Sequence, residues 1–494
     1  MSDIPTYAPV VILGAGPAGL TAAYELCRLG TPCIVLEQDS VVGGLARTVD
    51  HNGYLFDIGG HRFYTKVPLI EQIWKEVLGD DLLVRPRLSR IYYRGRFFQY
   101  PLDPVNTLAR LGTVETLRCL ASYARARLAP QSPEDNFETW VSNRFGSRLF
   151  NIFFKGYTEK VWGIPCKQIR SEWAAQRIQG LSLWSLIRDA LASRGLRTTS
   201  IKTLVREFYY PRRGPGLMWS RMRELVERQG AHVILNAPVE EIRRDGRRIT
   251  AVRAGGCLYA GEHFISSIPI GELIARLRPS APKPLRRAAL DFHYRDFITV
   301  ALIFRATNLF PDNWIYVHDP AVSVGRIQNY SNWSPEMTPD SETTCLGMEY
   351  FCQQGDNLWT KSDADLITQA AQELASLKLA PVDAMIDAKV IRVPKAYPVY
   401  DGSYKRGLSE VRQFLNAVPN LQLVGRNGMH RYNNQDHSML TAILAARNIM
   451  GASHNLWELD IDSGYLEEGS DLVLEDLEAL EATQPSAPRV VSVA

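Results

Sequence analysis

The fold of this chain is decided by the stretch Val10-Val11-Ile12-Leu13-Gly14-Ala15-Gly16-Pro17-Ala18-Gly19. Its apolar half predicts a buried strand, and residues 20–29 after the last glycine predict a helix. Gly14 permits a tight turn between the two, Gly16 lets a phosphate approach the backbone, and Gly19 lets the helix lie close to the sheet. Free N–H groups at such a helix start bind phosphate oxygens. The stretch therefore predicts a dinucleotide site.

An acidic residue and then two adjacent glycines follow this motif at the spacing that a dinucleotide site needs. The next apolar run, Cys33–Leu36, ends in Glu37, where a carboxylate accepts the ribose hydroxyls of a dinucleotide. Gly43 and Gly44 come next, followed by Arg47, and glycines there bring backbone against a pyrophosphate. The alternative, a glycine turn that binds nothing, does not account for the strand, the helix and the acid together.

Length and composition restrict the class of protein. The chain has 494 residues, more than the ~250–300 that one core supports, so we expect two or three packed units. A formal net charge of +3 argues against nucleic acid as a partner. The seven cysteines include no C-x-x-C pair, which argues against a disulfide framework and against a metal site.

The chain shows no sign of a membrane or secretory segment. No stretch reaches the ~20 apolar residues of a membrane span, and the first apolar run is too short for a signal peptide. We therefore expect a cytoplasmic protein. Basic runs at residues 85–96 and 194–228 leave peripheral contact with acidic lipid open, although a solvated face is the simpler interpretation.

The segment Gly53-Tyr54-Leu55-Phe56-Asp57-Ile58-Gly59-Gly60-His61 resembles the FAD-dependent amine oxidase and protoporphyrinogen oxidase superfamily. Leu423-Val424-Gly425-Arg426, with a helix beginning near Ser438, agrees with it. This resemblance implies FAD rather than NAD, with the helix start pointing at the flavin. Beyond the residues above, it implies cofactor contacts at Ala18, Gly59, Gly60, His61, Val239, Gly425, Gln435, Ser438 and Met439.

Within that superfamily the chain most resembles the UDP-galactopyranose mutases, piecewise from about residue 8 to residue 450. The matching segments include Gln99-Tyr100-Pro101, Lys160–Pro165, Gln176-Arg177, Arg326–Ser331, Tyr397-Pro398 and Asn434–Ser438. The resemblance implies that Arg326 and Arg426 clamp the diphosphate of a nucleotide sugar through forked, charge-assisted hydrogen bonds. It also implies substrate contacts at Tyr100, Trp162, Arg177, Trp314, Tyr316, Tyr397, Tyr432 and Asn434.

In that family the flavin itself does the chemistry. The N5 atom of reduced FAD attacks the anomeric carbon, the nucleotide diphosphate leaves, and the sugar recloses in pyranose or furanose form. This accounts for the absence of an obvious protein nucleophile. The resemblance makes His61, Arg326 and Arg426 the catalytic candidates, with no metal. It leaves open NAD(P)H as the reductant and a homo-oligomeric assembly.

Several positions depart from the mutase pattern. Leu102-Asp103 stands where the eukaryotic-type enzymes carry an aromatic residue and a glutamine at the uridine pocket, Thr158 replaces an asparagine, and Arg62 follows His61 in place of an apolar residue. Two residues are missing between Tyr432 and Asn434. A true FAD-dependent oxidase or desaturase therefore stays the alternative, and a non-catalytic flavoprotein is a weaker one.

For several of these residues, taken singly, a purely structural role also stays open. Trp162 fits the core of a helical region, and Trp314 and Tyr316 fit a strand with alternating aromatics equally well. Arg326 or Arg426, taken singly, fits an ordinary surface arginine.

We expect an α/β fold with a discontinuous Rossmann-like FAD domain, a helical insertion and a mainly antiparallel sheet domain for the substrate. The expected ranges are 1–75, 207–275 and 395–455 for the FAD domain, 105–206 for the helices, 76–104 and 276–394 for the substrate sheet, and 456–494 for an acidic C-terminal tail.

Overall fold

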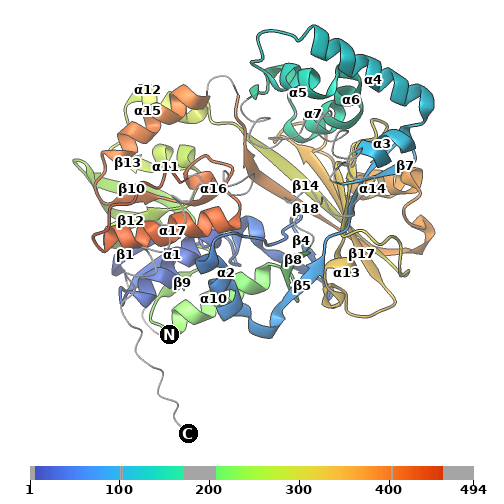
Figure 1. Cartoon of the computed structure of the whole chain (residues 1–494). Coiled ribbons are helices and arrows are strands. Elements are labelled where there is room, and N and C mark those ends of the chain that lie inside the picture. Colours follow the sequence, from blue (N-terminus) through green and yellow to red (C-terminus); the bar gives the residue numbers. More distant parts are fainter. Residues whose placement is uncertain (1–5, 101, 103, 172–206, 402–403, 460–494) are drawn as a thin grey trace.

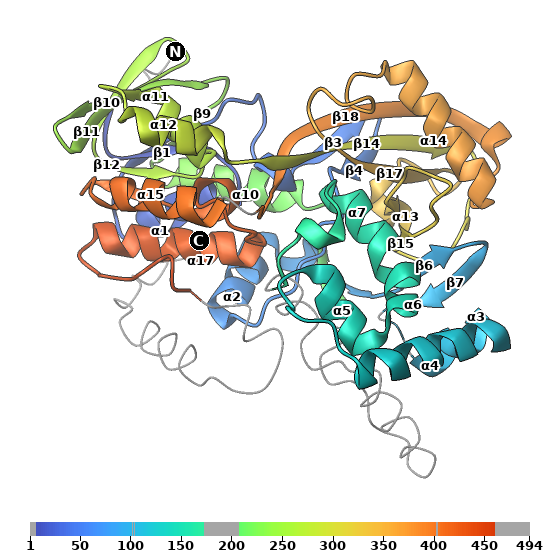
Figure 2. The same ribbon diagram turned by 90° about the horizontal axis from the view of Figure 1, so that it is seen from above.

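Two large sheets organise the computed structural model, which describes residues 6–100, 102, 104–171, 207–401 and 404–459. The first sheet and its helices form one lobe, and the second sheet, with a group of helices above it, forms the other (Figure 1). Seen from above, the long strands β14 (Tyr294–Phe304) and β18 (Met385–Pro398) reach from the second lobe toward the first (Figure 2).

The first sheet is built around the strand that the opening motif predicts. Its order is β13-β10-β11-β12-β1-β2-β9, and a further strand, β19, pairs with β12. β1 runs parallel to β2 and β12, whereas β11 runs antiparallel to β10 and β12. The bounds are β1 (Tyr7–Leu13), β2 (Cys33–Leu36), β9 (His232–Ile234), β10 (Val239–Asp245), β11 (Arg248–Ala254), β12 (Cys257–Ser266), β13 (Leu277–Arg278) and β19 (Leu421–Leu423).

Apolar helices cover this sheet and place their starts at one edge of it. Helix α1 (Pro17–Arg28) begins directly after the glycine turn and packs against α10 (Gly216–Arg228) and α17 (Gln435–Ile449). Most of α1 and α17 is buried, which is the pattern of a helix enclosed on several sides. Further helices of this lobe are α2 (Pro68–Leu78), α11 (Ile270–Arg276), α12 (Lys283–Leu290) and α15 (Tyr404–Asn416).

The second sheet has the order β18-β14-β17-β16-β15-β6-β7. All its neighbours are antiparallel except β6 and β15, which run parallel. Helix α14 (Asp363–Leu377) begins at Ser362, whose hydroxyl accepts from the Asp365 N–H, and packs its apolar side against the sheet. The remaining bounds are β17 (Thr344–Cys352), β16 (Arg326–Asn329), β15 (Trp314–Val317), β6 (Ser89–Tyr93) and β7 (Arg96–Gln99).

A group of helices lies above the second sheet and fits the predicted helical insertion. They are α3 (Pro104–Leu111), α4 (Thr113–Leu128), α5 (Phe137–Phe145), α6 (Ser147–Leu149), a π-helical turn (Phe150–Lys155) and α7 (Gly156–Trp162). Their shared core continues onto Ile91 and Phe98 of the second sheet. The expected helix around residues 181–191 lies outside the described residues, and the boundaries of the domains stay predictions.

Asp57 ends the ribbon formed by β3 (Thr48–His51) and β4 (Tyr54–Asp57), and its carbonyl accepts the hydroxyl of Tyr330, which follows β16 in the second lobe, at 2.8 Å. The Asp57 side chain is 1% exposed and accepts hydrogen bonds from the Tyr210 hydroxyl at 2.6 Å and from the Thr48 hydroxyl at 3.0 Å. Tyr210 belongs to β8 (Glu207–Pro211), which pairs with β5 (Leu82–Pro86). Burial raises the pKa of Asp57 to about 7.

We expect Gly19→Ala to destabilise the protein severely. A Cβ on Gly19 would lie 1.8 Å from the Gly14 carbonyl oxygen, so α1 would have to move off β1. The expected loss in the free energy of unfolding is about 3 kcal/mol or more, with loss of bound FAD. Gly407→Ala in α15 is the control, because its Cβ would make only ordinary contacts, the nearest at 3.6 Å. Equal denaturation midpoints for both variants would contradict this packing.

We expect the stability of the protein to fall between pH 4 and pH 7 through Asp57. In this window the folded state keeps the carboxyl proton, because its pKa is about 7, whereas the unfolded chain loses it near ~3.9. Stability therefore decreases as pH rises, by at most ~1.4 kcal/mol per pH unit. Urea unfolding across this range measures the slope, and Asp57→Asn should flatten it. An identical slope in the variant would show that Asp57 does not titrate there.

Candidate active site

Three separated segments meet to form the predicted cofactor cradle. A Cβ on Gly44 would lie 3.3 Å from the Gly16 Cα, so the two glycine loops lie against each other. Gly425 has a φ of +77°, and a Cβ there would lie 2.9 Å from the Ala18 Cβ. Only glycine fits backbones this close. The space that these glycines keep open is the space that a pyrophosphate needs, so the residues fit FAD.

The side chain of Glu37 is held by backbone N–H groups, one of which belongs to the glycine turn. Its carboxylate accepts the Ala15 N–H at 2.7 Å and the Asp39 N–H at 3.0 Å, and only 5% of the residue is exposed. Burial raises its pKa, and the N–H groups of Asp39 and Ala15 oppose the rise. The charged form is thus held by backbone donors, while the remaining lone pairs can accept ribose hydroxyls.

The other predicted cofactor residues surround this turn. The Gly43 N–H donates to the Ala15 carbonyl at 2.9 Å, and Arg47 pairs with Asp39. Val239 begins β10, two residues after Ala237, whose N–H donates to the Glu37 carbonyl at 2.7 Å. Ser438 and Met439 are buried in the first turns of α17. Their contacts with FAD stay predictions.

Helix α17 directs its positive end at the space beyond the cradle. Asn434 is its N-cap and Gln435 its first residue, and both line the large cavity described next. The Gln435 Oε1 atom is buried and has no hydrogen-bond partner among the described residues. An N–H donor of a bound ring would satisfy it. The helix start also favours negative charge on such a ring.

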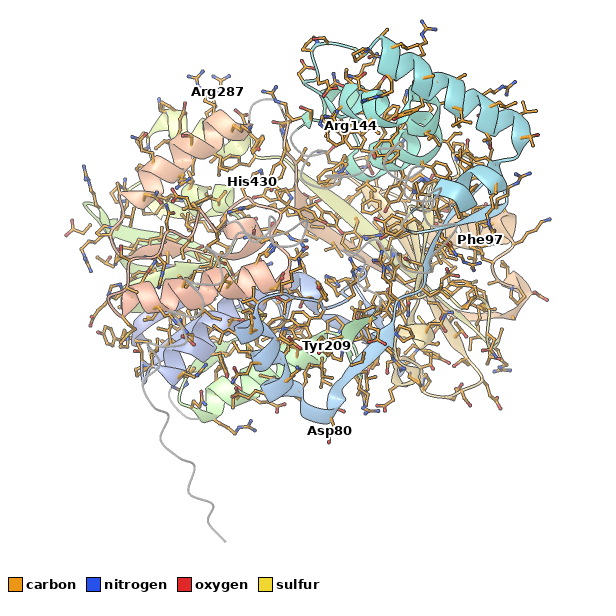
Figure 3. All side chains as sticks on the ribbon, in the orientation of Figure 1. Asp80, Phe97, Arg144, Tyr209, Arg287 and His430 are labelled. Atoms are coloured by element: carbon orange, nitrogen blue, oxygen red, sulfur yellow. The ribbon has the colours of Figure 1, made fainter. Side chains whose placement is uncertain are left out.

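The cavity has a volume of ≈1050 Å³ and lies where the two lobes and the helical group meet. Side chains fill the space around it, and His430 lies at the junction of the lobes (Figure 3). All the predicted catalytic and substrate residues within the described part of the chain line it, with three more of the cofactor candidates, although they come from segments far apart in the sequence. They are Gly59, Gly60, His61, Tyr100, Trp162, Trp314, Tyr316, Arg326, Tyr397, Arg426, Tyr432, Asn434 and Gln435. Arg177 lies outside the described residues.

Arg326 enters the cavity from the first position of β16. Its guanidinium bonds Glu349 of the neighbouring strand, with 2.7 Å from Nε and 2.6 Å from Nη2, and Nη2 also donates to the Tyr397 hydroxyl at 3.2 Å. Its side chain is 18% exposed. Burial works to lower the Arg326 pKa, but the Glu349 carboxylate outweighs it and the pKa is raised. Arg326 is therefore a fixed cation.

Arg426 enters from α16 (Gly425–Gly428) and has only neutral partners. Its Nε donates to the Asn433 carbonyl at 2.9 Å, and Nη1 donates to the Ala396 carbonyl at 3.0 Å. Its guanidinium carbon lies 5.0 Å from the Tyr432 ring centre and 5.4 Å from the Tyr397 ring centre. No carboxylate pairs with it among the described residues, so its charge stays available to an anion.

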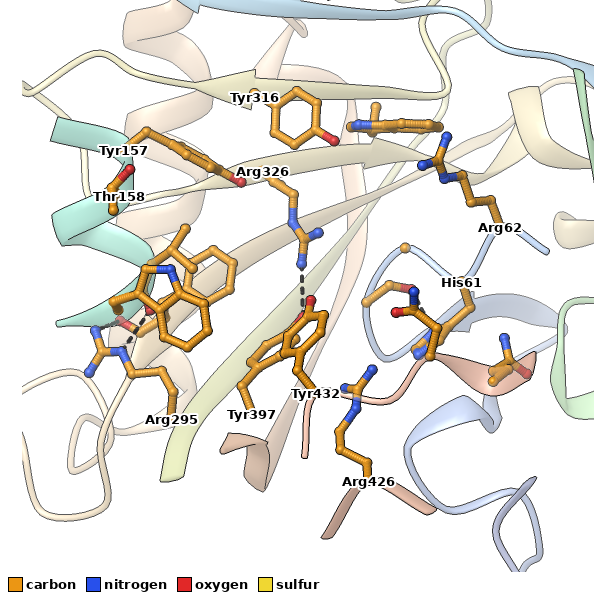
Figure 4. Close-up of a pocket in the computed structure, with 18 of the residues that line it drawn as sticks. His61, Arg62, Tyr157, Thr158, Arg295, Tyr316, Arg326, Tyr397, Arg426 and Tyr432 are labelled. Carbon is orange, nitrogen blue, oxygen red and sulfur yellow. Dashed lines mark hydrogen bonds between the residues drawn. The ribbon is translucent and has the colours of Figure 1, made fainter. Parts of the chain in front are cut away.

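Tyr397 and Tyr432 form a stacked pair between the two arginines. Their ring centres are 5.7 Å apart and their planes differ by 12°; Figure 4 shows the pair between Arg326 and Arg426. Burial raises the pKa of Tyr397, and the charge of Arg326 opposes the rise. The Tyr397 hydroxyl thus stays a neutral donor beside the cations.

His61 is a neutral imidazole on the loop between the cradle and the cavity. Its Nδ1 donates to the Gly59 carbonyl at 3.0 Å in the tautomer that this bond requires. Burial lowers the His61 pKa to about 3, and the charge of Arg426 acts in the same direction. The Nε2 atom is therefore an acceptor and not an acid at neutral pH.

The predicted aromatic residues line a second side of the cavity. Tyr100 contacts Tyr316 with ring centres 4.7 Å apart, and Trp314 meets Tyr316 edge to face at 6.2 Å. Trp162 ends α7 and lies 6.4 Å from the Tyr432 ring centre. Trp162 and Trp314 are also 8% and 4% exposed, so each packs in a core and lines the cavity at once.

Several residues that hold the side chains of this site in place were not predicted from the sequence. Glu349 is fully buried and also accepts from Gln328 Nε2 at 2.8 Å. Arg295 donates to the carbonyls of Lys160, Val161 and Phe351, and so fastens α7 to the second sheet. Tyr157 stacks on His318 at 4.6 Å. The signal for Glu349 was a lone charge within the apolar run Cys345–Phe351.

Positive charge dominates the cavity. Its described lining holds seven arginines and one lysine, but the carboxylate of Asp436 alone. Carbonyl oxygens accept the hydrogen bonds of Arg295, and Glu349 balances the charge of Arg326. The net charge of the lining still favours an anionic ligand. No described helix is both long and apolar enough to span a bilayer.

Relatives of known sequence point to two activities within one superfamily. A phytoene desaturase (lycopene-forming) of Pantoea ananas is 26% identical over 297 residues, which is 52% of this chain and 54% of that protein. A probable UDP-galactopyranose mutase of Klebsiella pneumoniae is 24% identical over 170 residues, 32% of this chain and 42% of that protein. The alignments thus span about half the length of each relative.

Matches to solved structures cover more of this chain than the sequence alignments do. A crystal structure of reduced UDP-galactopyranose mutase matches with a TM-score of 0.79 and 23% identity, over 90% of this chain and 94% of that one. A putative protoporphyrinogen oxidase from Exiguobacterium sp. 255-15 matches with a TM-score of 0.67 and 18% identity, over 94% and 100%. At these identities the likeness shows the fold, and it confirms the predicted α/β class.

A family model described as flavin containing amine oxidoreductase matches residues 17–450. With the structural match to the mutase, it confirms the resemblance on which the sequence analysis relied. The family implies FAD as the cofactor, in agreement with the glycine cradle. This chain belongs to the flavin containing amine oxidoreductase family and is a flavin-dependent enzyme.

Proposed function

We propose that this protein is a nucleotide-sugar mutase, which interconverts pyranose and furanose forms of a sugar attached to a nucleoside diphosphate. The proposal is carried by one observation: a cationic cavity in which Arg326 and Arg426, one hundred positions apart in sequence, approach one pair of stacked tyrosines. The named activity of the structural neighbour, UDP-galactopyranose mutase, supports it.

The two arginines divide the work of holding a diphosphate. Arg426 supplies charge without a competing carboxylate, whereas Arg326 supplies a guanidinium whose orientation Glu349 fixes. The hydroxyls of Tyr397 and Tyr432 add neutral donors. Such a clamp stabilises the diphosphate both in the bound substrate and as the leaving group, and it holds the anomeric carbon in one position.

Reduced FAD, when bound, supplies the nucleophile that the chain itself lacks. Gly59, His61 and Gln435, which we expect to contact the cofactor, line the same cavity as Arg326 and Arg426, so a sugar held by its diphosphate shares that cavity with the flavin. The neutral His61 can accept a sugar hydroxyl through Nε2. The helical group and the aromatic lining exclude water, which protects a reactive centre from hydrolysis.

The charged lining argues against a desaturase acting on a long apolar substrate. An apolar chain in this cavity would take water from Arg426 and from the arginines near Trp314 without replacing their hydrogen bonds. Each buried charge left unpaired in this way costs several kcal/mol. An oxidoreductase with an anionic substrate fits the same lining, and electron accounting separates it from a mutase.

We expect Arg326→Lys and Arg426→Ala to weaken UDP binding by about 1.5–3 kcal/mol each, because each removes charge-assisted hydrogen bonds to phosphate. Arg326→Lys keeps a cation beside Glu349, which guards against unfolding. FAD content should stay unchanged, since neither residue lies in the glycine cradle. Calorimetric titration with UDP measures the loss, and Arg406→Ala, at a side chain that is 90% exposed, is the control. Wild-type affinity in both variants would refute the clamp.

We expect turnover only with reduced enzyme and without net consumption of electrons. Dithionite-reduced protein, mixed anaerobically with UDP- and dTDP-sugars, should give pyranose–furanose conversion by NMR while the flavin spectrum stays reduced. Oxidised enzyme is the matched control. Flavin oxidation that matches product formation one to one would instead identify an oxidoreductase.

A further inference from the structure

A second pair of arginines lies in the same cavity, apart from the diphosphate clamp. The guanidinium carbons of Arg62 and Arg87 each lie 5.7 Å from the ring centre of Trp314, and that of Arg87 also lies 5.4 Å from the ring centre of Tyr100. Both arginines line the cavity. Figure 4 shows Arg62 on the side of Tyr316 and Arg326, above His61.

Neither arginine is balanced by an acid. Among the described residues no carboxylate pairs with Arg62 or Arg87, and the buried Nε of Arg87 has no acceptor. Burial lowers the Arg87 pKa, and the neighbouring charge of Arg62 lowers it further. The rings of Trp314 and Tyr100 compensate only in part, because a cation–π contact leaves the N–H donors unused. Two like charges, the buried Nε of Arg87 without an acceptor and the exposed guanidinium of Arg62, fit an oxyanion between them.

Arg62 and Arg87 lie at a distance from the diphosphate clamp that suits contact with the sugar rather than with the diphosphate. Tyr316 of β15 lies directly opposite Arg326 of β16, and Trp314 is two residues along β15. Two residues of a strand span about 7 Å and return to the same face of the sheet. One sugar ring can bridge that distance from the clamp. Arg62 also follows His61 directly, where the mutases carry an apolar residue.

We propose that Arg62 and Arg87 form a second oxyanion subsite, which binds a carboxylate on the sugar of the nucleotide-sugar substrate. The substrate class is then a nucleoside diphosphate linked to an acidic sugar, such as a uronic acid. This inference rests on the proposed function, since the clamp must hold the diphosphate for the sugar to reach Trp314. It also gives Arg62 a role that the mutase resemblance does not.

The experiment compares binding of UDP, UDP-galactose and UDP-galacturonate to the full-length holoenzyme, by calorimetry and by perturbation of the flavin absorbance. We expect wild-type protein to bind the galacturonate at least about tenfold more tightly than the galactose, because only the former carries the second anion. Arg62→Met and Arg87→Met should each bring this ratio close to one. Arg412→Met is the control, because Arg412 also lies over a tryptophan, 4.8 Å from the ring centre of Trp457, but does not line the cavity.

Each outcome decides a separate point. Equal affinity of the wild type for both sugars, with UDP still bound, overturns the acidic-sugar subsite and leaves the proposed function standing. No binding of UDP removes the proposed function and this inference with it. Tighter binding of NADPH than of NADH, lost in Arg62→Met and Arg87→Met, would assign the pair to a phosphate of the reductant and overturn the sugar assignment. The wild-type comparison needs no variant, so a misfolded variant does not spoil it.

Discussion

A buried carboxylate fixes the wall of the cavity. Glu349 is fully enclosed in β17 and is tolerated there only because Arg326 and Gln328 both bond it. The strand register makes this possible, since Arg326 and Glu349 are direct neighbours across β16 and β17. Once Glu349 holds the guanidinium, the Nη2 atom reaches Tyr397 and the tyrosine pair is fixed in turn. The same network leaves no room for a side chain at Gly60, because a Cβ there would lie 2.7 Å from Gln328 Nε2.

This network balances the charge of Arg326 but not that of Arg426, and the difference affects the pKa of His61. Arg326 and Glu349 together are nearly neutral, so Arg426 carries most of the uncompensated charge of the clamp. That charge, after burial, helps to keep the His61 imidazole unprotonated. A diphosphate between the arginines would reverse this effect and raise the His61 pKa. Ligand binding and the proton affinity of His61 are therefore linked through the charge of Arg426.

The sequence predicts what depends on local order. The strand at Tyr7–Leu13, the glycine turn, the helix Pro17–Arg28 and the acid at Glu37 are contiguous or nearly so, and each was predicted, although the helix begins at Pro17 and not at residue 20. Resemblance then supplied Arg326, Arg426 and the tyrosine pair. Glu349, Gln328 and Arg295 were missed because their roles depend on strand register and on contacts between segments over fifty residues apart. No periodicity encodes such contacts.

The division between cradle and cavity also explains why the comparisons name different activities. The cradle lies on the first sheet and is the part that we expect to hold FAD, the cofactor that the family implies, so it does not distinguish a desaturase from a mutase. The residues that line the cavity lie elsewhere: on β15, β16 and β18 of the second sheet, on the loop after Gly59, and on the segment from Arg426 to Gln435. Substitutions there change the charge of the cavity without touching the cradle. A fold can thus stay the same while the residues that line its cavity, and with them the ligand that the cavity favours, change.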